Sequence, residues 1–489
     1  MSARSAFGSV IVASNRGPLS FYEAPGGETV ASRGAGGVAT ALDTALQGGG
    51  TWIAAAMSAT DREMAARNPH GRIPVEDAPY SLRYLTLSPE DFDGYYNYVS
   101  NGILWFAHHY LWDNVHSPVW DASTETAWTR YRRVNEAFAE ALADEASRLP
   151  HPVAFLVQDY HLALVPGMLR ELVPGASIAH FSHTSMAGPT YVRALPTAMR
   201  RELLAGMLGA DVLGFHSEAW AENFLMSAHY IPGARVDLGR RRVRLDDREI
   251  LARVHPMSVD ADAIRRAAAS PEVADAKREL EAWRGDAKLI VRVDRFELTK
   301  NILRGFLAYE AFLERHPEWQ SRVRFLALLS PSRTELPEYR TYAEECLAEA
   351  ARVNGALGTD SWQPIEVRAR DDHVGAIAAF SLYDVLFVNP VIDGLNLVSM
   401  EGPVANRRRG VLVLSRNAGA YSRLGRYSLG VNPHDVGEQA EALRAALTMP
   451  EDEKAERARG LSRWVRANPP SRWVASQLRD LERVTARRS

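Results

Sequence analysis

Short apolar runs alternate with longer stretches of helical periodicity along almost the whole chain. Each run is short enough for a strand and is followed by a turn or polar segment and then a helical stretch. Strands that are apolar throughout are typical of parallel sheets covered by helices on both faces. We therefore predict an α/β protein with buried strands at 9–13, 154–157, 178–181, 212–215, 290–293, 323–329, 385–388 and 411–414.

The predicted strands fall into two groups, which indicates two domains. A length of 489 residues also exceeds what one hydrophobic core usually serves. The Arg-rich segment 236–247 and a helical stretch over 260–283 separate the groups. We expect Rossmann-like domains over 1–255 and 256–469, followed after Pro469-Pro470 by a helix over 470–489.

Composition narrows the class of protein. Apolar residues make up 46% and charged residues 24% of the chain, as in ordinary globular proteins, and the net charge is -3. The single cysteine, Cys346, excludes an internal disulfide and a cysteine-based zinc site. The N-terminal apolar stretch is too short for a signal peptide, and no run approaches the roughly 20 residues that span a bilayer. We expect a cytoplasmic protein that binds neither nucleic acid nor membrane; association of identical chains stays open.

Ligands of open α/β sheets bind beyond the carboxyl ends of the strands. The residues at those positions are polar, cationic and rich in glycine, and they occupy 15–16, 159–161, 182–183, 216–217, 295–300, 330–333, 389–396 and 415–420. Cations, backbone N–H groups and helix N-termini all favour negative charge. The pattern therefore predicts a site for an anionic ligand.

The strand ends in the N-terminal half have more than one interpretation. Arg16 precedes a glycine cluster at 34–37 that fits a dinucleotide fingerprint, but the cluster does not follow its strand directly and lacks the acidic partner. Asp159 could cap a helix, orient a hydroxyl or act as a base. His183 could be a structural hydrogen-bonding group or a catalytic one. Neither has companions at metal-ligand spacing, so we expect no metal.

The strongest chemical signal lies in the C-terminal half. Arg295 and Lys300 follow a predicted buried strand and precede a helix, an arrangement that can hold a diphosphate. Downstream, Asp393 lies in a turn, and Asn396 leads into a helix that carries Glu401. In a transferase without a metal, such groups would neutralise a leaving diphosphate.

The chain resembles the trehalose-6-phosphate synthases of glycosyltransferase family 20, in order and over essentially its full length. The matching stretches are SNRGP, RGAGG, YYNYVSNGILW, QDYHL, the strand end at His183, VDRFELTKN, LAYEAFLERHPEW, SPSR, NPVIDGLNLV, VLVLSRNAGA and VNPHD. The resemblance implies a GT-B fold, in which two Rossmann-like domains face a cleft and a C-terminal helix crosses back to the N-terminal domain. It also implies transfer of glucose, with retention of configuration, from a nucleotide sugar to glucose 6-phosphate. The product would be α,α-trehalose 6-phosphate, and no cofactor would be required.

The resemblance also assigns roles to single residues. The acceptor phosphate is expected to contact Arg16, Tyr96, Trp105 and Arg333. Donor-binding residues are expected to be Gly36, Gly37, Arg295, Lys300, Asp372, Asn396, Leu397, Val398 and Glu401. The expected catalytic group comprises Asp159 at the acceptor sugar, His183 and Asp393 at the donor sugar, and Arg295 and Lys300 at the diphosphate.

The base and the acceptor stay open within this resemblance. Members that prefer uridine donors carry an aromatic residue where this chain has 370–373, and a carboxylate such as Asp372 would accept from the edge of guanine, so GDP-glucose is favoured over UDP-glucose. Ser185 replaces a usual proline and Met400 a usual lysine. These departures also fit a pseudo-glycosyltransferase, which joins a cyclitol nucleotide to an aminocyclitol phosphate through a C–N bond. Further alternatives are another phosphorylated acceptor and a silent regulatory homologue.

Overall fold

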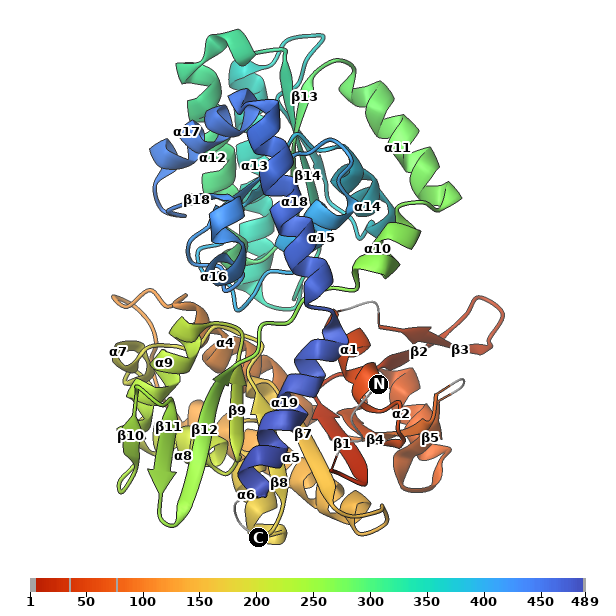
Figure 1. Ribbon diagram of the computed structural model, residues 1–489, viewed down its shortest axis with the longest axis vertical. Coiled ribbons are helices and arrows are strands. Elements are labelled where there is room, and N and C mark those ends of the chain that lie inside the picture. The colour runs from red at the N-terminus through yellow and green to blue at the C-terminus, as the bar shows by residue number, and fades with distance from the viewer. Residues whose placement is uncertain (1–5, 35–36, 76–77, 487–489) are drawn as a thin grey trace. The chain divides into compact units, whose positions relative to one another are not determined.

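The computed structural model describes residues 6–34, 37–75 and 78–486. The chain divides into two compact units. Unit 1 contains the residues up to Met257 together with those from Pro470 onward, and unit 2 is Ser258–Pro469. Each unit contains a sheet with helices packed on it (Figure 1).

Unit 1 is built on a ten-stranded sheet. Its strand order is β10 (Arg235–Asp237), β11 (Arg242–Leu245), β12 (Arg248–Val254), β9 (Val212–Phe215), β8 (Ser177–Phe181), β7 (Val153–Gln158), β1 (Ser9–Ser14), β4 (Gly50–Ala55), β6 (Tyr80–Leu85) and β5 (Arg72–Pro74). The strands from β12 to β6 run parallel, and antiparallel pairs complete both edges. A separate antiparallel hairpin consists of β2 (Leu19–Glu23) and β3 (Thr29–Arg33).

The helices of unit 1 connect these strands. They are α1 (Gly37–Ala45), α2 (Ala59–Ala66), η1 (Pro69–Gly71), α3 (Pro89–Phe92), the π-helix η2 (Asp93–Leu104), α4 (Trp105–His109), α5 (Ala122–Ala146), η3 (Tyr160–Leu162), α6 (Val165–Leu172), α7 (Pro189–Val192), α8 (Thr197–Leu208), α9 (Glu218–Ala228) and α19 (Pro470–Thr485). Side chains start several of them: Ser217 Oγ, for example, accepts from the Trp220 N–H at the beginning of α9.

Unit 2 is built on six parallel strands. Their order is β15 (Ile365–Arg368), β14 (Val323–Ser330), β13 (Lys288–Arg295), β16 (Val385–Val388), β17 (Val411–Ser415) and β18 (Leu429–Val431). Its helices are α10 (Ala261–Ala267), α11 (Pro271–Arg284), η4 (Leu298–Lys300), α12 (Ile302–Arg315), η5 (Pro317–Trp319), α13 (Pro337–Leu357), α14 (His373–Leu382), α15 (Val398–Ala405), α16 (Tyr421–Leu424), η6 (Gly425–Tyr427), α17 (Val436–Thr448) and α18 (Glu451–Ala467). A hydrophobic core joins this sheet to its helices and contains Ile290, Phe306, Phe325 and Leu443.

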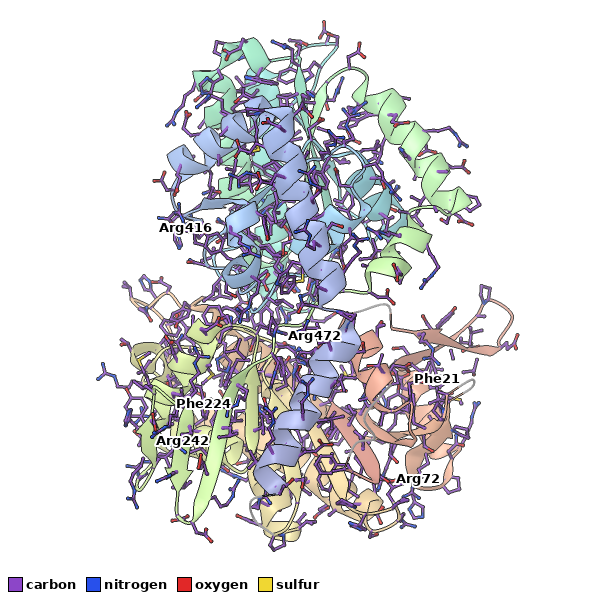
Figure 2. All side chains as sticks on the ribbon, viewed as in Figure 1. Phe21, Arg72, Phe224, Arg242, Arg416 and Arg472 are labelled. Atoms are coloured by element: carbon purple, nitrogen blue, oxygen red, sulfur yellow. The ribbon has the colours of Figure 1, made fainter. Side chains whose placement is uncertain are left out.

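The structure confirms every strand predicted from an apolar run, and it adds strands that the pattern did not reveal. In β6, buried positions alternate with partly exposed ones, so the segment lacks a continuous apolar run. The Arg-rich segment 236–247, expected only to separate the two groups, instead supplies β10 and β11 at one edge of the first sheet. Arg242 of β11 is labelled in Figure 2, and its Nη1 lies 2.7 Å from Glu249 Oε1 on the neighbouring strand, so this arginine forms a cross-strand ion pair.

Over the described ranges, every helix is either too short or too polar to cross a membrane.

The last helix returns to the first unit, as predicted. α19 follows unit 2 in the sequence, but it packs on α1, β8 and β9 of unit 1. Its Trp473 is 2% exposed and lies edge-on to Phe181 of β8, with 4.9 Å between the ring centroids. Unit 1 is therefore complete only with this helix in place.

We predict that Trp473→Ala lowers the free energy of unfolding of unit 1 by about 3–5 kcal/mol, because it empties a buried indole site. Denaturant unfolding, followed by hydrogen exchange of the α1 and β8 amides, measures the loss. Arg479→Ala on the exposed face of the same helix is the control and should change little. Equal effects of the two substitutions would contradict the packing role of Trp473.

Candidate functional site

In each unit the strand order reverses between two neighbouring strands. In unit 1 this point lies between β1 and β7, and in unit 2 it lies between β13 and β16. Ligands of doubly wound sheets bind at such points. Arg16 and Asp159 follow the first pair of strands, Arg295 ends β13, and Asp393 lies in the loop after β16. The topology therefore brings these four predicted site residues to the reversal points, whereas His183, Arg333 and Asp372 follow other strands.

Lys300 is held at the reversal point of unit 2 by carboxylates. Its Nζ lies 2.7 Å from Asp393 Oδ2 and 4.0 Å from Asp294 Oδ1. Burial would lower the pKa of Lys300, but Asp393 and Asp294 outweigh burial and raise the pKa. The ammonium group therefore stays charged, and the charge is already compensated within unit 2.

A buried arginine fixes the loop that carries Lys300. The side chain of Arg292 is fully buried; its Nε donates to Asp294 Oδ2 at 2.9 Å and its Nη2 to the Lys300 carbonyl at 2.7 Å. It also donates to Asn389 Oδ1 at the end of β16. Gly305 leaves room for the guanidinium, since a Cβ there would lie 2.3 Å from Arg292 Nη1. The loop between β13 and α12 is thus held in place by the buried side chain of Arg292.

The predicted donor loop starts α15. Asn396 adopts a left-handed backbone (φ 78°), its Nδ2 donates to Asp393 Oδ2 at 3.1 Å, and its Oδ1 accepts from the Ser399 N–H at 3.1 Å. Leu397 and Val398 therefore lie at the N-terminus of the helix, where backbone N–H groups favour an anion. Glu401 lies in the first turn, and burial raises its pKa to about 7.

The other two predicted cations of unit 2 meet at a residue that the sequence analysis missed. Arg295 Nη2 lies 3.0 Å, and Arg333 Nη1 3.3 Å, from Oε1 of the buried Glu297. Glu297 stands two positions after Arg295 in VDRFELTKN, so its only sequence signal is an acidic residue among cations at a strand end.

In unit 1 the structure brings Arg16 and Tyr96 together. Arg16 Nη2 donates to the Tyr96 hydroxyl at 3.3 Å, and the Tyr96 ring stacks on His161 with 5.9 Å between centroids. Trp105 follows the same π-helix and packs on His109, 3.9 Å away by ring centroids. The segment between Tyr95 and Trp105 is thus partly core and partly polar surface near Arg16.

Asp159 and His183 also lie together. Asp159 has φ 70°, caps no helix with its side chain, and accepts from the His183 backbone N–H at 3.0 Å. The His183 ring shares a 3.0 Å hydrogen bond between Nε2 and Gln158 Oε1. Burial, assisted by His216, holds the pKa of His183 well below its ordinary value. The ring is therefore neutral, and its Nε2–H donates to Gln158.

Asp372, the predicted guanine partner, has two partners within unit 2. Its Oδ1 accepts from the Gly375 N–H at 2.7 Å at the start of α14, and its Oδ2 lies 2.9 Å from Arg370 Nη2. Burial works to raise the pKa of Asp372, but the Gly375 N–H and Arg370 lower it. A base edge would share this carboxylate with Arg370.

Within each unit the structure joins some of the predicted site residues in pairs, while their roles stay predictions. Arg333 belongs to unit 2, so its grouping with Arg16, Tyr96 and Trp105 around one phosphate stays a prediction. Gly37 is the first residue of α1, whereas Gly36 lies outside the described residues.

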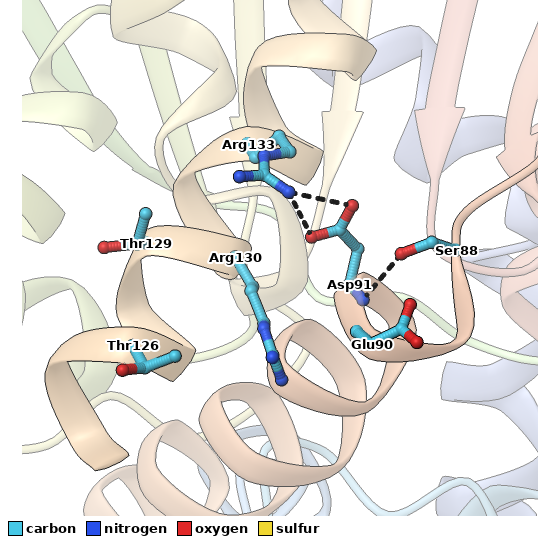
Figure 3. A pocket seen from close by; sticks show the side chains of 7 residues that line it. All are labelled: Ser88, Glu90, Asp91, Thr126, Thr129, Arg130 and Arg133. Carbon is cyan, nitrogen blue, oxygen red and sulfur yellow. Dashed lines mark hydrogen bonds and ion pairs between the residues drawn. The ribbon is translucent and has the colours of Figure 1, made fainter. Parts of the chain in front are cut away.

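A cavity of about 500 Å³ lies between α3 and α5, apart from all of these residues. Its lining consists of Ser88, Glu90, Asp91, Thr126, Thr129, Arg130 and Arg133 (Figure 3). Arg133 pairs with Asp91 at 3.0 Å, and the Arg130 chain packs against Gly94. No predicted site residue lines this cavity.

Comparisons with known proteins agree over nearly the whole chain. The model of glycosyltransferase family 20 matches residues 8–483. A bifunctional trehalose-6-phosphate synthase/phosphatase from Thermoproteus tenax is 34% identical over 95% of this chain, which spans only 62% of that longer protein. An alpha,alpha-trehalose-phosphate synthase (UDP-forming) from Pichia angusta is 31% identical over 98% of this chain and 99% of its own. A validamine 7-phosphate valienyltransferase from Streptomyces hygroscopicus is 31% identical over 88% of this chain and 84% of its own.

Solved structures are similar over both units. The trehalose-6-phosphate protein from E. coli, bound with UDP-2-fluoro glucose, has a TM-score of 0.83 at 29% identity and covers 97% of this chain and 99% of that one. The synthase from Burkholderia xenovorans in complex with glucose-6-phosphate has a TM-score of 0.82 at 29% identity, with the same coverage of 97% and 99%. These likenesses confirm the predicted fold class.

We predict that Glu401→Gln stabilises the protein more at pH 8 than at pH 5. The folded-state pKa of about 7 lies above the ordinary 4.5, so ionising the partly buried carboxylate destabilises the fold as pH rises through this interval. Thermal unfolding at both pH values tests this. Glu344→Gln on the exposed face of α13 is the control, and equal gains for Glu401→Gln at pH 5 and pH 8 would contradict the assignment.

Proposed function

The chain belongs to glycosyltransferase family 20, and from that premise we propose that it moves glucose from a nucleotide sugar to glucose 6-phosphate, with retention. The bond between the sugar's C1 and the diphosphate breaks, and C1 bonds to the acceptor hydroxyl. The hydroxyl proton passes to the leaving phosphate oxygen. The products are α,α-trehalose 6-phosphate and a nucleoside diphosphate.

The observation that carries this proposal is the cationic reversal point of unit 2. Lys300 and Arg295 flank the end of β13, and the N-terminus of α15 follows Asn396. Together they offer fixed positive charge where the leaving diphosphate develops negative charge, which is the main requirement of a transfer without a covalent protein nucleophile. Asp393 is proposed to exchange its contact with Lys300 for hydroxyls of the donor sugar as the diphosphate takes the lysine.

The acceptor is proposed to bind through its phosphate. Arg16 with the Tyr96 hydroxyl, Trp105, and Arg333 are the assigned contacts, and arginines suit phosphate because they donate in a fixed fork. Asp159 and the neutral His183 would orient the acceptor and donor hydroxyls, since Asp159 accepts from the His183 backbone N–H at 3.0 Å and Gln158 holds the His183 ring.

For the base we propose guanine over uracil, because the segment 370–373 offers carboxylates and no Phe, Tyr or Trp. A carboxylate edge accepts two N–H groups of guanine, whereas uracil presents a single N–H. The solved E. coli relative carries a uridine sugar, so the two bases must be compared directly.

A second candidate function is coupling of a cyclitol nucleotide to an aminocyclitol phosphate. The validamine 7-phosphate valienyltransferase has the same 31% identity to the chain as the Pichia synthase, over 88% of the chain against 98%. Met400 stands in the place of a usual lysine and is fully buried. This position therefore supplies no positively charged side chain to the site. Ser185, in the place of a usual proline, donates to the His108 carbonyl at 2.6 Å.

We predict that pure protein given glucose 6-phosphate and either GDP-glucose or UDP-glucose releases nucleoside diphosphate and an α,α-1,1-linked disaccharide phosphate, faster with GDP-glucose. Mass spectrometry with NMR of the product, and the two rates, measure this. Faster turnover with UDP-glucose would reject the guanine assignment alone. No product from either donor, with turnover of a cyclitol nucleotide and an aminocyclitol phosphate, would establish the second candidate.

We predict that Arg333→Ala weakens binding of glucose 6-phosphate by about 1.5 to 3 kcal/mol, the usual loss for a hydrogen bond between charged groups. Titration calorimetry gives the affinity. Arg352→Ala is the matched control, because Arg352 pairs with Glu310 and Glu349 on α12 and α13. An unchanged affinity of the Arg333→Ala protein would remove Arg333 from the acceptor site.

A further inference from the structure

Glu297 is a buried carboxylate shared by two arginines that come from neighbouring strands. Arg295 on β13 pairs in register with Ser330 on β14, and the chain then places Glu297 and Ser332 two positions beyond this pair. The Ser332 hydroxyl donates to Glu297 Oε1 at 2.9 Å, and both arginines reach the same oxygen. Sheet register thus converts two separate strand ends into one ionic cluster.

Glu297 is ionised, and its partners contact only one of its two oxygens. Burial would raise the pKa of Glu297, but Arg295 and Arg333 outweigh burial and lower the pKa, so the side chain is a carboxylate. All of its recorded partners meet at Oε1, whereas Oε2 is buried and has no hydrogen-bond partner among the described residues. A buried carboxylate is unfavourable unless it is fully paired, so fold stability alone gives little reason for this arrangement.

The two arginines are held differently. Arg333 is mostly buried, has a left-handed backbone (φ 45°), and also donates to the Tyr339 hydroxyl at 3.0 Å. The Arg295 side chain is 53% exposed, yet it still reaches Glu297. A long exposed cation would otherwise sample many rotamers, so the buried carboxylate restricts the side chain that a ligand must meet.

We propose that Glu297 is a positioning residue that couples the two anion sites of the enzyme, because it holds the donor-diphosphate cation Arg295 and the acceptor-phosphate cation Arg333 through one oxygen. The inference rests on the proposed function, which assigns these ligands to the arginines. Removal of Arg333 leaves Glu297 to Arg295 alone. Glu297 is then held from one side only, so Arg295 loses the orientation that the shared oxygen gave it.

The test measures binding of each ligand separately, by calorimetry, with GDP or UDP for the donor side and glucose 6-phosphate for the acceptor side. Glu297→Gln should weaken both by about two- to tenfold, as expected when rotamer-rich side chains lose their orientation. Arg333→Ala should weaken nucleoside diphosphate binding in the otherwise unchanged protein, and much less when Glu297→Gln is also present. That loss of coupling separates positioning from a general loss of fold.

Glu310→Gln is the matched control, because Glu310 holds Arg352 in unit 2 with none of the predicted site residues involved. It should leave both affinities unchanged. If Glu297→Gln does not fold, Ser332→Ala removes a donor from the same oxygen and should shift both affinities in the same direction.

Unchanged affinities in Glu297→Gln, a change for one ligand only, or an equal effect of Arg333→Ala in both backgrounds would each overturn the inference. If the unsubstituted protein binds neither ligand, the proposed function itself fails, and the inference fails with it.

Discussion

A guanidinium buried without solvent is the constraint on which the chemistry of unit 2 depends. Arg292 lies inside the sheet, where an unpaired cation would be strongly destabilising. Its donors are satisfied by Asp294, by the Lys300 carbonyl and by Asn389, which belong to the ends of β13 and β16 and to the loop after β13. Satisfying one buried charge therefore fixes the backbone that presents Lys300, as well as the two strand ends between which a ligand would bind.

The other cations of this site are also paired with carboxylates of the protein. Lys300 is compensated by Asp393, and the cluster around Glu297 contains two cations and one anion. The cations are thus oriented before any ligand arrives. Ligand anions would replace protein carboxylates rather than water, so little reorganisation accompanies binding.

The sequence was sufficient to predict the α/β class, the apolar strands and the last helix, because each depends on a local pattern of burial. The return of that helix to unit 1 was implied by the family resemblance alone. The sequence also indicated that Arg295, Lys300, Asp393 and Asn396 end or follow strands of the second sheet, since the carboxyl-end rule needs only strand order; their roles stay predictions. It could not predict the shared role of Glu297, which arises from the register of β13 against β14. Nor could it predict that Asp159 binds the backbone of His183, because that contact joins two strand ends across the sheet.

The return of α19 to unit 1 has a consequence for synthesis on the ribosome. Domains commonly fold as they emerge, from the N-terminus onward. Here the whole of Ser258–Pro469 is translated before Trp473 becomes available to cover Phe181. Unit 2 is continuous in the sequence and can fold first. Until α19 is made, unit 1 has an apolar face of its sheet uncovered. During that interval the nascent chain would be a natural client for chaperones that shield exposed hydrophobic surface.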